Sequence, residues 1–284
     1  MYESVLLDVG GTFVKCGCMR DGELCLKGQF PIDEAGSAEE ILMPILDFLA
    51  AHPAPRAVIC MPGPANYETG ACQMAHKFAA IRDLPMKPWL EARLPGTKVS
   101  FLHDGVAFLL GEQIRGAASG CDCAAGVMLG TGLGFALCRG GRVLVRTVRT
   151  PAHPLWCAPW RGGIAEDFVS GRSLRRQWME QGGEPLDVHE IAMLARCGDA
   201  RAKALFSGAG QALGEILTAH LRDYPVERIV VGGQIARSWD LFAPAFRDAC
   251  SIPALPARHI GSAALYGNEA YGRHGDALLE VVEA

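Results

Sequence analysis

The sequence lacks an excess of basic residues and any run of them. Its 284 residues contain 27 Lys and Arg against 31 Asp and Glu, a formal net charge of −4. Nucleic acids and anionic membrane surfaces attract proteins through clustered positive charge. The charge pattern therefore argues against a nucleic-acid partner and against a membrane partner.

Long hydrophobic segments are also absent. No stretch approaches the roughly 18 consecutive apolar residues that are typical of a transmembrane helix. The N-terminal residues do not form a basic region followed by a long apolar one, as a secretion signal would. We therefore expect a soluble, cytoplasmic protein. With 50% hydrophobic and 20% charged residues, the chain should form a substantial core.

The 11 cysteines do not indicate a disulfide framework or a metal site. Their number is odd, and several lie in apolar segments such as "AVICM" (57–61), so we expect reduced thiols in the core. Two Cys-x-Cys pairs, Cys16/Cys18 and Cys121/Cys123, could bind a metal in principle. Two thiolates alone do not complete a tetrahedral site, and core packing is the preferred interpretation.

Three common nucleotide-binding signatures are missing. No G-x-x-x-x-G-K-[ST] sequence occurs, which excludes a Walker-type phosphate loop. No H-R-D or D-F-G sequence occurs, which excludes a protein kinase. The glycines at 130–134 precede "FALCRGG", which reads as a strand and a turn. A dinucleotide-binding loop would instead open a helix.

What the sequence does contain is one pattern that occurs twice. Residues 4–20 read as a strand, a glycine bend and a second strand, and residues 124–145 repeat this order. Helical patterns follow in both halves. We therefore predict two related α/β domains, 1–117 and 118–284, with a cleft between them. The last helix of the second domain is expected to pack back on the first.

Local signals place several helices and strands. Ser37 and Glu40 form a capping-box signature before a helical pattern, and residues 200–222 form a long one. A strand ends at Gly232 and Gly233 before a further helix. Backbone N–H groups there could bind the ribose or base edge of a nucleotide, or could simply cap the helix.

Two glycine-rich loops directly follow strands, and they read Asp8-Val9-Gly10-Gly11-Thr12 and Gly130-Thr131-Gly132-Leu133-Gly134. Because glycine has no Cβ, backbone N–H groups at such loops can approach a polyphosphate. Asp8 would place a carboxylate where a partly hydrated Mg²⁺ could use it. Either loop taken alone is equally consistent with an ordinary tight hairpin turn.

Four motifs in one order resemble a known family. They are Asp8-x-Gly10-Gly11-Thr12-x-x-Lys15, then His103-Asp104 at the end of a strand, then "LGTGLG", then "IVVGGQI". This set resembles the ROK family (repressors, open reading frames, kinases) of the actin-like ATPase superfamily, over nearly the whole chain. "MPGPANYETG" (61–70) also looks like the family's sugar-loop segment. The resemblance implies a two-lobed α/β fold of the actin-like ATPase (ribonuclease H-like) type with a central cleft.

The resemblance implies an ATP-dependent kinase that phosphorylates a hexose, most often at the 6-hydroxyl. Asp104 matches the family's general base, and a carboxylate at the end of a strand can orient a hydroxyl for attack. Its position would suit a helix N-cap equally well, and the two roles are compatible. ATP and Mg²⁺ are the implied cofactors, Mg²⁺ being held by Asp8 through water, and a homodimer is the implied assembly.

The resemblance also assigns residues to each ligand. The implied nucleotide-binding residues are Asp8, Gly10, Gly11, Thr12, Lys15, Gly130, Thr131, Gly132, Gly134, Gly232 and Gly233. The implied sugar-binding residues are Gly63, Asn66, His103, Asp104, His153 and Glu166.

Several positions depart from the family pattern. His103 stands where the family has Asn, and Thr150 stands where it has a sugar-binding Glu. Cys157 matches the first thiolate of the family's zinc motif, but Pro159 and Ile164 replace the next two, so we predict that zinc is absent. These changes leave the sugar open. Glucose is possible, and an amino or N-acetylated hexose such as N-acetylmannosamine is comparably possible.

The sequence also bears on two alternatives to a kinase. A ROK repressor would need a helix-turn-helix before the first strand. That strand begins at about residue 4, so a repressor is not expected. A non-catalytic or regulatory sugar-binding protein is disfavoured because Asp8, Thr12 and Asp104 are all present.

Overall fold

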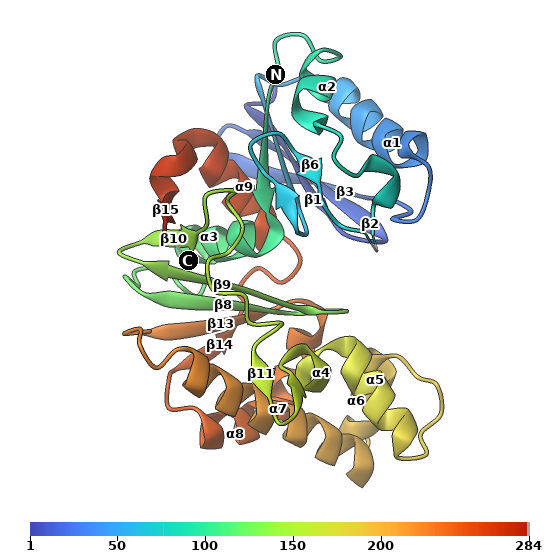
Figure 1. Cartoon of the computed structure of the whole chain (residues 1–284), viewed down its shortest axis with the longest axis vertical. Coiled ribbons are helices and arrows are strands. Elements are labelled where there is room, and N and C mark those ends of the chain that lie inside the picture. The colour runs from blue at the N-terminus through green and yellow to red at the C-terminus, as the bar shows by residue number, and fades with distance from the viewer. Residues whose placement is uncertain (76, 283–284) are drawn as a thin grey trace. The chain divides into compact units, whose positions relative to one another are not determined.

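The computed structural model describes residues 1–75 and 77–282, which form two compact units (Figure 1). Unit 1 contains Met1–Arg115, Arg142–Ala152 and the C-terminal segment from Ser262 onward. Unit 2 contains Gly116–Gly141 and His153–Gly261.

A single boundary between residues 117 and 118 does not describe this division. The chain leaves unit 1 after Arg115, returns to it for residues 142–152, and returns again from Ser262 onward. Strands β10 (Arg142–Val145) and β15 (Leu279–Val281) pair in parallel and so join the two returning segments. Both returning segments lie within the range 118–284 that the sequence assigns to the second domain.

Unit 1 is built on a five-stranded sheet with the order β3-β2-β1-β4-β7. The strands are β1 (Ser4–Val9), β2 (Phe13–Arg20), β3 (Glu23–Pro31), β4 (Arg56–Met61) and β7 (Lys98–His103). The first two form the antiparallel pair that the sequence predicts, and β3 extends it to an antiparallel meander. Strands β4 and β7 run parallel to β1. The parallel strands therefore end at one edge of the sheet, where Asp8 is paired with Cys60 and Met61 with His103.

Helices flank this sheet. Those of unit 1 are α1 (Ala38–Ala51), α2 (Met86–Glu91), α3 (Asp104–Arg115) and α9 (Ala263–His274), with short 3-10 turns at Ala79–Ile81 and Gly275–Leu278. The predicted capping box of α1 is confirmed, since Ser37 and Glu40 each accept a hydrogen bond from the other's backbone N–H. The apolar face of α1 packs into the core beneath the sheet.

Helices α3 and α9 cross at close range, and α9 also contacts β1 and β4. A Cβ on Gly111 would overlap the carbonyl oxygen of Ala263, and a Cβ on Gly267 would overlap that of Ala107. The two glycines therefore set the separation of the helices, because a larger residue would force the backbones apart. Through this crossing, α9 supports the helix that begins at Asp104.

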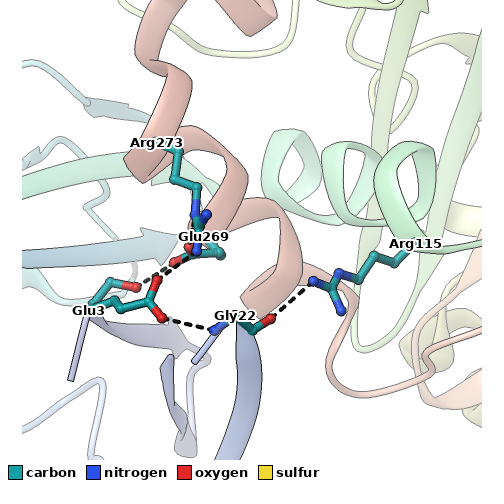
Figure 2. A network of polar contacts seen from close by, with 6 residues as sticks. Glu3, Gly22, Arg115, Glu269 and Arg273 are labelled. Carbon is teal, nitrogen blue, oxygen red and sulfur yellow. Dashed lines mark hydrogen bonds and ion pairs between the residues drawn. The ribbon is translucent and has the colours of Figure 1, made fainter. Parts of the chain in front are cut away.

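A polar network joins α9 to the first strands and to the end of α3 (Figure 2). The buried carboxylate of Glu269 pairs with Arg273, and Arg273 also lies 2.8 Å from Glu3. Glu3 accepts a hydrogen bond from the Gly22 N–H at 2.8 Å, and the Gly22 carbonyl accepts one from Arg115 at 3.2 Å. The C-terminal end of α3 is thus held by the same chain of contacts as α9.

Unit 2 has a sheet in which β14 (Ala254–Pro256), β13 (Arg228–Gly232) and β8 (Ala124–Leu129) are parallel and β9 (Leu133–Arg139) is antiparallel to β8. Its other elements are β11 (Pro159–Trp160), β12 (Gly163–Ile164), α4 (Glu166–Val169), α5 (Gly171–Glu180), α6 (Val188–Arg196), α7 (Ala200–His220), a 3-10 turn at Gln234–Ser238 and α8 (Trp239–Ala249). Units 1 and 2 each open with a strand, a glycine bend and an antiparallel strand, as predicted.

Two global properties bear on the predictions made from composition. Within the described residues, no helix combines the length and apolar character needed to cross a bilayer. All eleven cysteines fall in the described part of the chain and are free thiols, and seven of them are buried.

Candidate active site

The first glycine loop connects β1 to β2 directly after Asp8. The Gly10 N–H donates to the Phe13 carbonyl at 3.0 Å, and the Thr12 carbonyl accepts the Ile32 N–H at 2.9 Å. Gly11 and Thr12 lie between these two bonds, and Thr12 is exposed. The loop is therefore fixed at both ends while Thr12 between them is exposed, as an anion-binding loop requires of at least part of its backbone.

Asp8 lies at the edge of the sheet among polar side chains. Lys15, its cross-strand partner, places Nζ 3.3 Å from Oδ2, and the Cys60 thiol lies 3.6 Å from Oδ1. Burial raises the pKa of the Asp8 carboxyl, Lys15 lowers it, and the negative charge of Asp104 raises it further. Two carboxylates, Asp8 and Asp104, therefore share one region of unit 1.

Asp104 follows β7 and is the first residue of α3. Its Oδ1 accepts the N–H of the next residue, Gly105, at 2.7 Å, a contact that orients the carboxylate at the start of α3 but is not the N2 or N3 bond of a helix N-cap. The side chain retains 29% exposure, so a ligand can also reach it. Asp104 can therefore both contact the start of α3 and transfer a proton.

His103 precedes Asp104 and is mostly buried. Its Nδ1 accepts the Gly105 N–H at 3.0 Å, and we therefore assign the proton of the neutral ring to Nε2. Tyr67 packs edge-on against the ring, with centroids 5.7 Å apart. A Cβ on Gly63 would lie 3.4 Å from Nε2 and 2.9 Å from the Tyr67 hydroxyl, so Gly63 allows this packing. Sequence analysis missed Tyr67, which no local pattern distinguishes from a core aromatic.

The stability of the protein should depend on pH through His103. Burial lowers the pKa of this imidazole from its ordinary 6.5, and the negative charge of Asp104 only partly opposes the effect. Below about pH 6.5 the unfolded chain takes up the proton more readily than the folded one. We therefore expect the contribution of His103 to the free energy of unfolding to be largest above pH 6.5 and to fall as the pH decreases.

Urea unfolding between pH 5 and 8 tests this expectation. The His103→Asn variant should show a shallower pH dependence than the wild type, although His220, whose pKa is also lowered by burial, preserves part of the slope. The exposed His189 supplies the control, since His189→Asn should keep the wild-type slope. An unchanged slope in His103→Asn would contradict the assignment.

Asn66 stabilises the loop that contains it. Its side-chain oxygen accepts the N–H groups of Glu68 at 3.0 Å and Thr69 at 3.3 Å, an Asx turn. The resemblance to the ROK family implied that Asn66 and Gly63 bind the sugar. The structure places Gly63 next to His103, and gives Asn66 a role within the loop. A sugar contact by either residue remains a prediction.

The second glycine loop joins β8 to β9 in unit 2. The Gly130 N–H donates to the Gly132 carbonyl at 3.1 Å, and the Gly130 carbonyl accepts the Gly171 N–H at 2.8 Å. A Cβ on Gly171 would lie 2.8 Å from that oxygen. The sequence analysis missed Gly171, which no local pattern distinguishes from other glycines near the start of a helix.

The third glycine segment adjoins the same loop. Gly233 has a φ of +82°, and a Cβ there would overlap the Leu129 backbone directly before the loop. Gly232 is the last residue of β13 and pairs with Met128 of β8. The glycine loop at 130–134, the start of α5 and the end of β13 therefore meet in one place within unit 2.

Glu166 is bound to the second glycine loop. Its Oε2 accepts the Leu133 N–H at 2.8 Å, and Oε1 pairs with Arg172. A Cβ on Gly132 would lie 2.6 Å from Oε2, so the carboxylate occupies the space that the glycine leaves. These contacts give Glu166 a role in supporting the loop, and the sugar contact expected of it remains a prediction.

The segment around His153 has its own support in unit 2. His153 Nε2 forms a hydrogen bond with the Tyr224 hydroxyl at 2.7 Å. Pro159 and Ile164, which replace two thiolates of the family's zinc motif, face each other across the β11–β12 pair. In the part of the chain that the structure describes, no three His, Cys, Asp or Glu side chains are grouped to hold a metal.

Comparison with known proteins places these motifs in a family. The model of the ROK family matches residues 4–251. Glucokinase from Thermotoga maritima is 26% identical over 269 residues, which cover 84% of each chain. The repressor Mlc from Escherichia coli is 26% identical over 83% of this chain and 62% of Mlc. β-Glucoside kinase from Klebsiella pneumoniae is 34% identical over 132 residues, or 46% of this chain and 44% of that kinase.

The fold is found in solved structures. The ROK family glucokinase from Streptomyces griseus, solved with glucose and AMPPNP, superposes with a TM-score of 0.76. It is 23% identical, and the match covers 96% of this chain and 99% of the glucokinase. The α/β fold class predicted from the sequence is thereby confirmed. The match to the family model spans most of the chain and includes the first two glycine loops. The chain therefore belongs to the ROK family.

Proposed function

We propose that the chain is an ATP-dependent sugar kinase that phosphorylates a hexose or hexose derivative at the 6-hydroxyl. The observation that carries the proposal is the shared position of Asp8 and Asp104 at the carboxyl ends of parallel strands, beside the first glycine loop. Kinases among the relatives, and a structural neighbour solved with glucose and AMPPNP, support the same activity.

Asp104 is the proposed general base. Its Oδ1 accepts the Gly105 N–H at 2.7 Å, and we assign Oδ2 to the proton of the attacking hydroxyl. Removal of this proton as the bond to phosphorus forms strengthens the nucleophile. Fixing Oδ1 limits rotation of the carboxylate, so Oδ2 would meet the hydroxyl in a restricted orientation.

His103 is proposed to orient the sugar. With Nδ1 accepting from Gly105, Nε2 carries the only proton of the neutral ring and can donate to a sugar hydroxyl. The lowered pKa keeps the ring neutral near pH 7. A single donor in place of the amide of Asn, which both donates and accepts, would alter which hydroxyl or N-acetyl group is recognised.

The residues around Asp8 fit a Mg²⁺ ion. Mg²⁺ prefers carboxylate oxygens, keeps several waters, and binds through one or two carboxylates together with substrate phosphates. Burial and the nearby Asp104 both disfavour the charged form of Asp8, and a cation would compensate for this. Asp8 would hold the ion through water, and Mg²⁺ when bound would supply positive charge to the ATP phosphates.

The two glycine loops would bind the phosphates. Gly10, Gly11 and Thr12 are the proposed contacts in unit 1. Gly130, Thr131, Gly132 and Gly134 are those in unit 2, with Gly232 and Gly233 beside the nucleoside. The Lys15 ammonium, 3.3 Å from Asp8, adds a positive charge near the first loop.

A coupled assay of ADP release across glucose, amino hexoses and N-acetyl hexoses, including N-acetylmannosamine, tests the function. We expect one class of hexose to stimulate ATP turnover, with the product carrying phosphate on the 6-hydroxyl by NMR. Absence of stimulation by every sugar would refute the kinase.

A second candidate is a regulatory sugar-binding protein without turnover, which the match to the repressor Mlc supports. Calorimetry with the same sugars separates the two functions. Sugar binding without ADP release would favour this candidate over the kinase.

A further inference from the structure

An ion pair covers the first glycine loop in unit 1. Glu34 Oε2 lies over Gly11 so closely that a Cβ on Gly11 would overlap it. Lys77 Nζ lies 3.0 Å from the same oxygen and 3.3 Å from the position of that Cβ. A carboxylate and an ammonium therefore meet directly above the backbone that is proposed to receive phosphate.

A backbone hydrogen bond fixes the segments that carry Glu34 and Lys77, but the two side chains are held less firmly. The buried Phe78 donates its N–H to the Glu34 carbonyl at 2.7 Å, which ties the two segments together. Among the described residues, Oε2 is buried yet has no hydrogen-bond partner of acceptable geometry, despite the 3.0 Å ion-pair distance. The two side chains are about 30% exposed, at 29% for Lys77 and 31% for Glu34, so Nζ has room to turn toward a ligand.

At the second glycine loop, a carboxylate supports the loop through a direct hydrogen bond. Glu166 Oε2 fills the space over Gly132 and accepts the Leu133 N–H at 2.8 Å, while Oε1 pairs with Arg172. That carboxylate is bonded to the loop itself. Glu34 has the corresponding position over Gly11 but no described hydrogen bond to a loop N–H, so its position depends on Lys77.

We infer that Lys77 is an anion-binding residue of the first glycine loop, with Glu34 as its counter-ion when no ligand is bound. The inference rests on the proposed nucleotide site. Phosphoryl oxygens that approach Gly11 would be repelled by the Glu34 carboxylate and attracted by Nζ. The ligand therefore displaces Glu34 and takes over the pairing with Lys77.

This arrangement predicts that two substitutions will change the affinity for phosphate in opposite directions. Lys77→Met removes the charge while keeping a long side chain, and should weaken binding of Mg·AMPPNP by about 10- to 100-fold, as for loss of a charged hydrogen bond. Glu34→Gln removes the competing carboxylate and should tighten binding by about 3- to 10-fold. Lys77→Arg should restore most of the affinity.

Isothermal titration calorimetry with Mg·AMPPNP, and separately with glucose 6-phosphate, measures these effects. The first probe reports on nucleotide phosphates and the second on a phosphorylated sugar, so the two titrations identify which phosphoryl group Lys77 binds. The exposed Lys98 lies at the start of β7, at the opposite end of the strand from His103. Lys98→Met is the matched control and should retain the wild-type dissociation constants.

A purely structural ion pair would behave differently. Lys77→Met and Glu34→Gln would then lower the melting temperature together and shift affinity in the same direction, or not at all, and either result overturns the inference.

If wild-type protein bound no AMPPNP, the proposed nucleotide site itself would fail. If the wild type bound AMPPNP normally and Lys77→Met changed neither probe's affinity, only the role of Lys77 would be refuted.

Discussion

Replacement of Asp104 by Asn is expected to lower kcat by at least about 100-fold, the effect typical of losing a general base. The neutral amide cannot take the proton of the attacking hydroxyl. Its carbonyl oxygen can still accept the Gly105 N–H that Oδ1 accepts at 2.7 Å, so the start of α3 should be retained. The dissociation constant for Mg·AMPPNP should change little.

Comparison with Asp104→Ala separates catalysis from support of the start of α3. Both variants should lose similar activity, but only Asp104→Ala should also lose stability, by roughly 0.5–1.5 kcal/mol for the missing hydrogen bond to the Gly105 N–H. Steady-state kinetics on the best substrate and thermal unfolding measure the two properties. Near-normal turnover in Asp104→Asn would mean that another residue is the base.

Replacement of Gly267 by Ala is expected to destabilise the protein by at least about 2 kcal/mol, at the upper range for overpacking. The added methyl would overlap the Ala107 carbonyl oxygen, which belongs to the backbone of α3 and cannot turn aside. Ala107 lies one turn after Asp104, so separation of the helices would also displace the carboxylate. We therefore expect kcat to fall together with the melting temperature.

The control is the same substitution where the space is open. Gly208 is an exposed residue of helix α7, and a Cβ there would have no neighbour within 4 Å among the described residues. Gly208→Ala should stabilise the helix by about 1 kcal/mol, because Ala has the higher helix propensity. Thermal unfolding of both variants tests the opposite signs. Stabilisation by both would show that α3 and α9 can separate without cost.

Elements with a local signature were predictable from the sequence. The capping box at Ser37 and Glu40 and the two strand–bend–strand patterns depend on residues close together in the chain. The order of the glycine motifs was enough to identify the family, and the match over residues 4–251 confirms it. None of these inferences required knowing which distant segments meet.

Contacts between distant segments were not predictable. The pairing of β10 with β15 joins segments more than 130 positions apart in the sequence, by the register of Val143 with Leu279. Glu166 was expected at the sugar, but it is bonded to Leu133 of the second glycine loop. No pattern around Lys77 indicated that it would pair with Glu34 above Gly11.

The sequence by itself determined the two strand–bend–strand patterns, the family, and the candidate acids Asp8 and Asp104, because each follows from local spacing or motif order. The tertiary structure decided which carboxylates and cations meet at each loop and how closely α3 approaches α9. Such contacts depend on side chains brought together by sheet pairing and helix crossing, where an added methyl group or an unpaired charge changes the free energy by kilocalories.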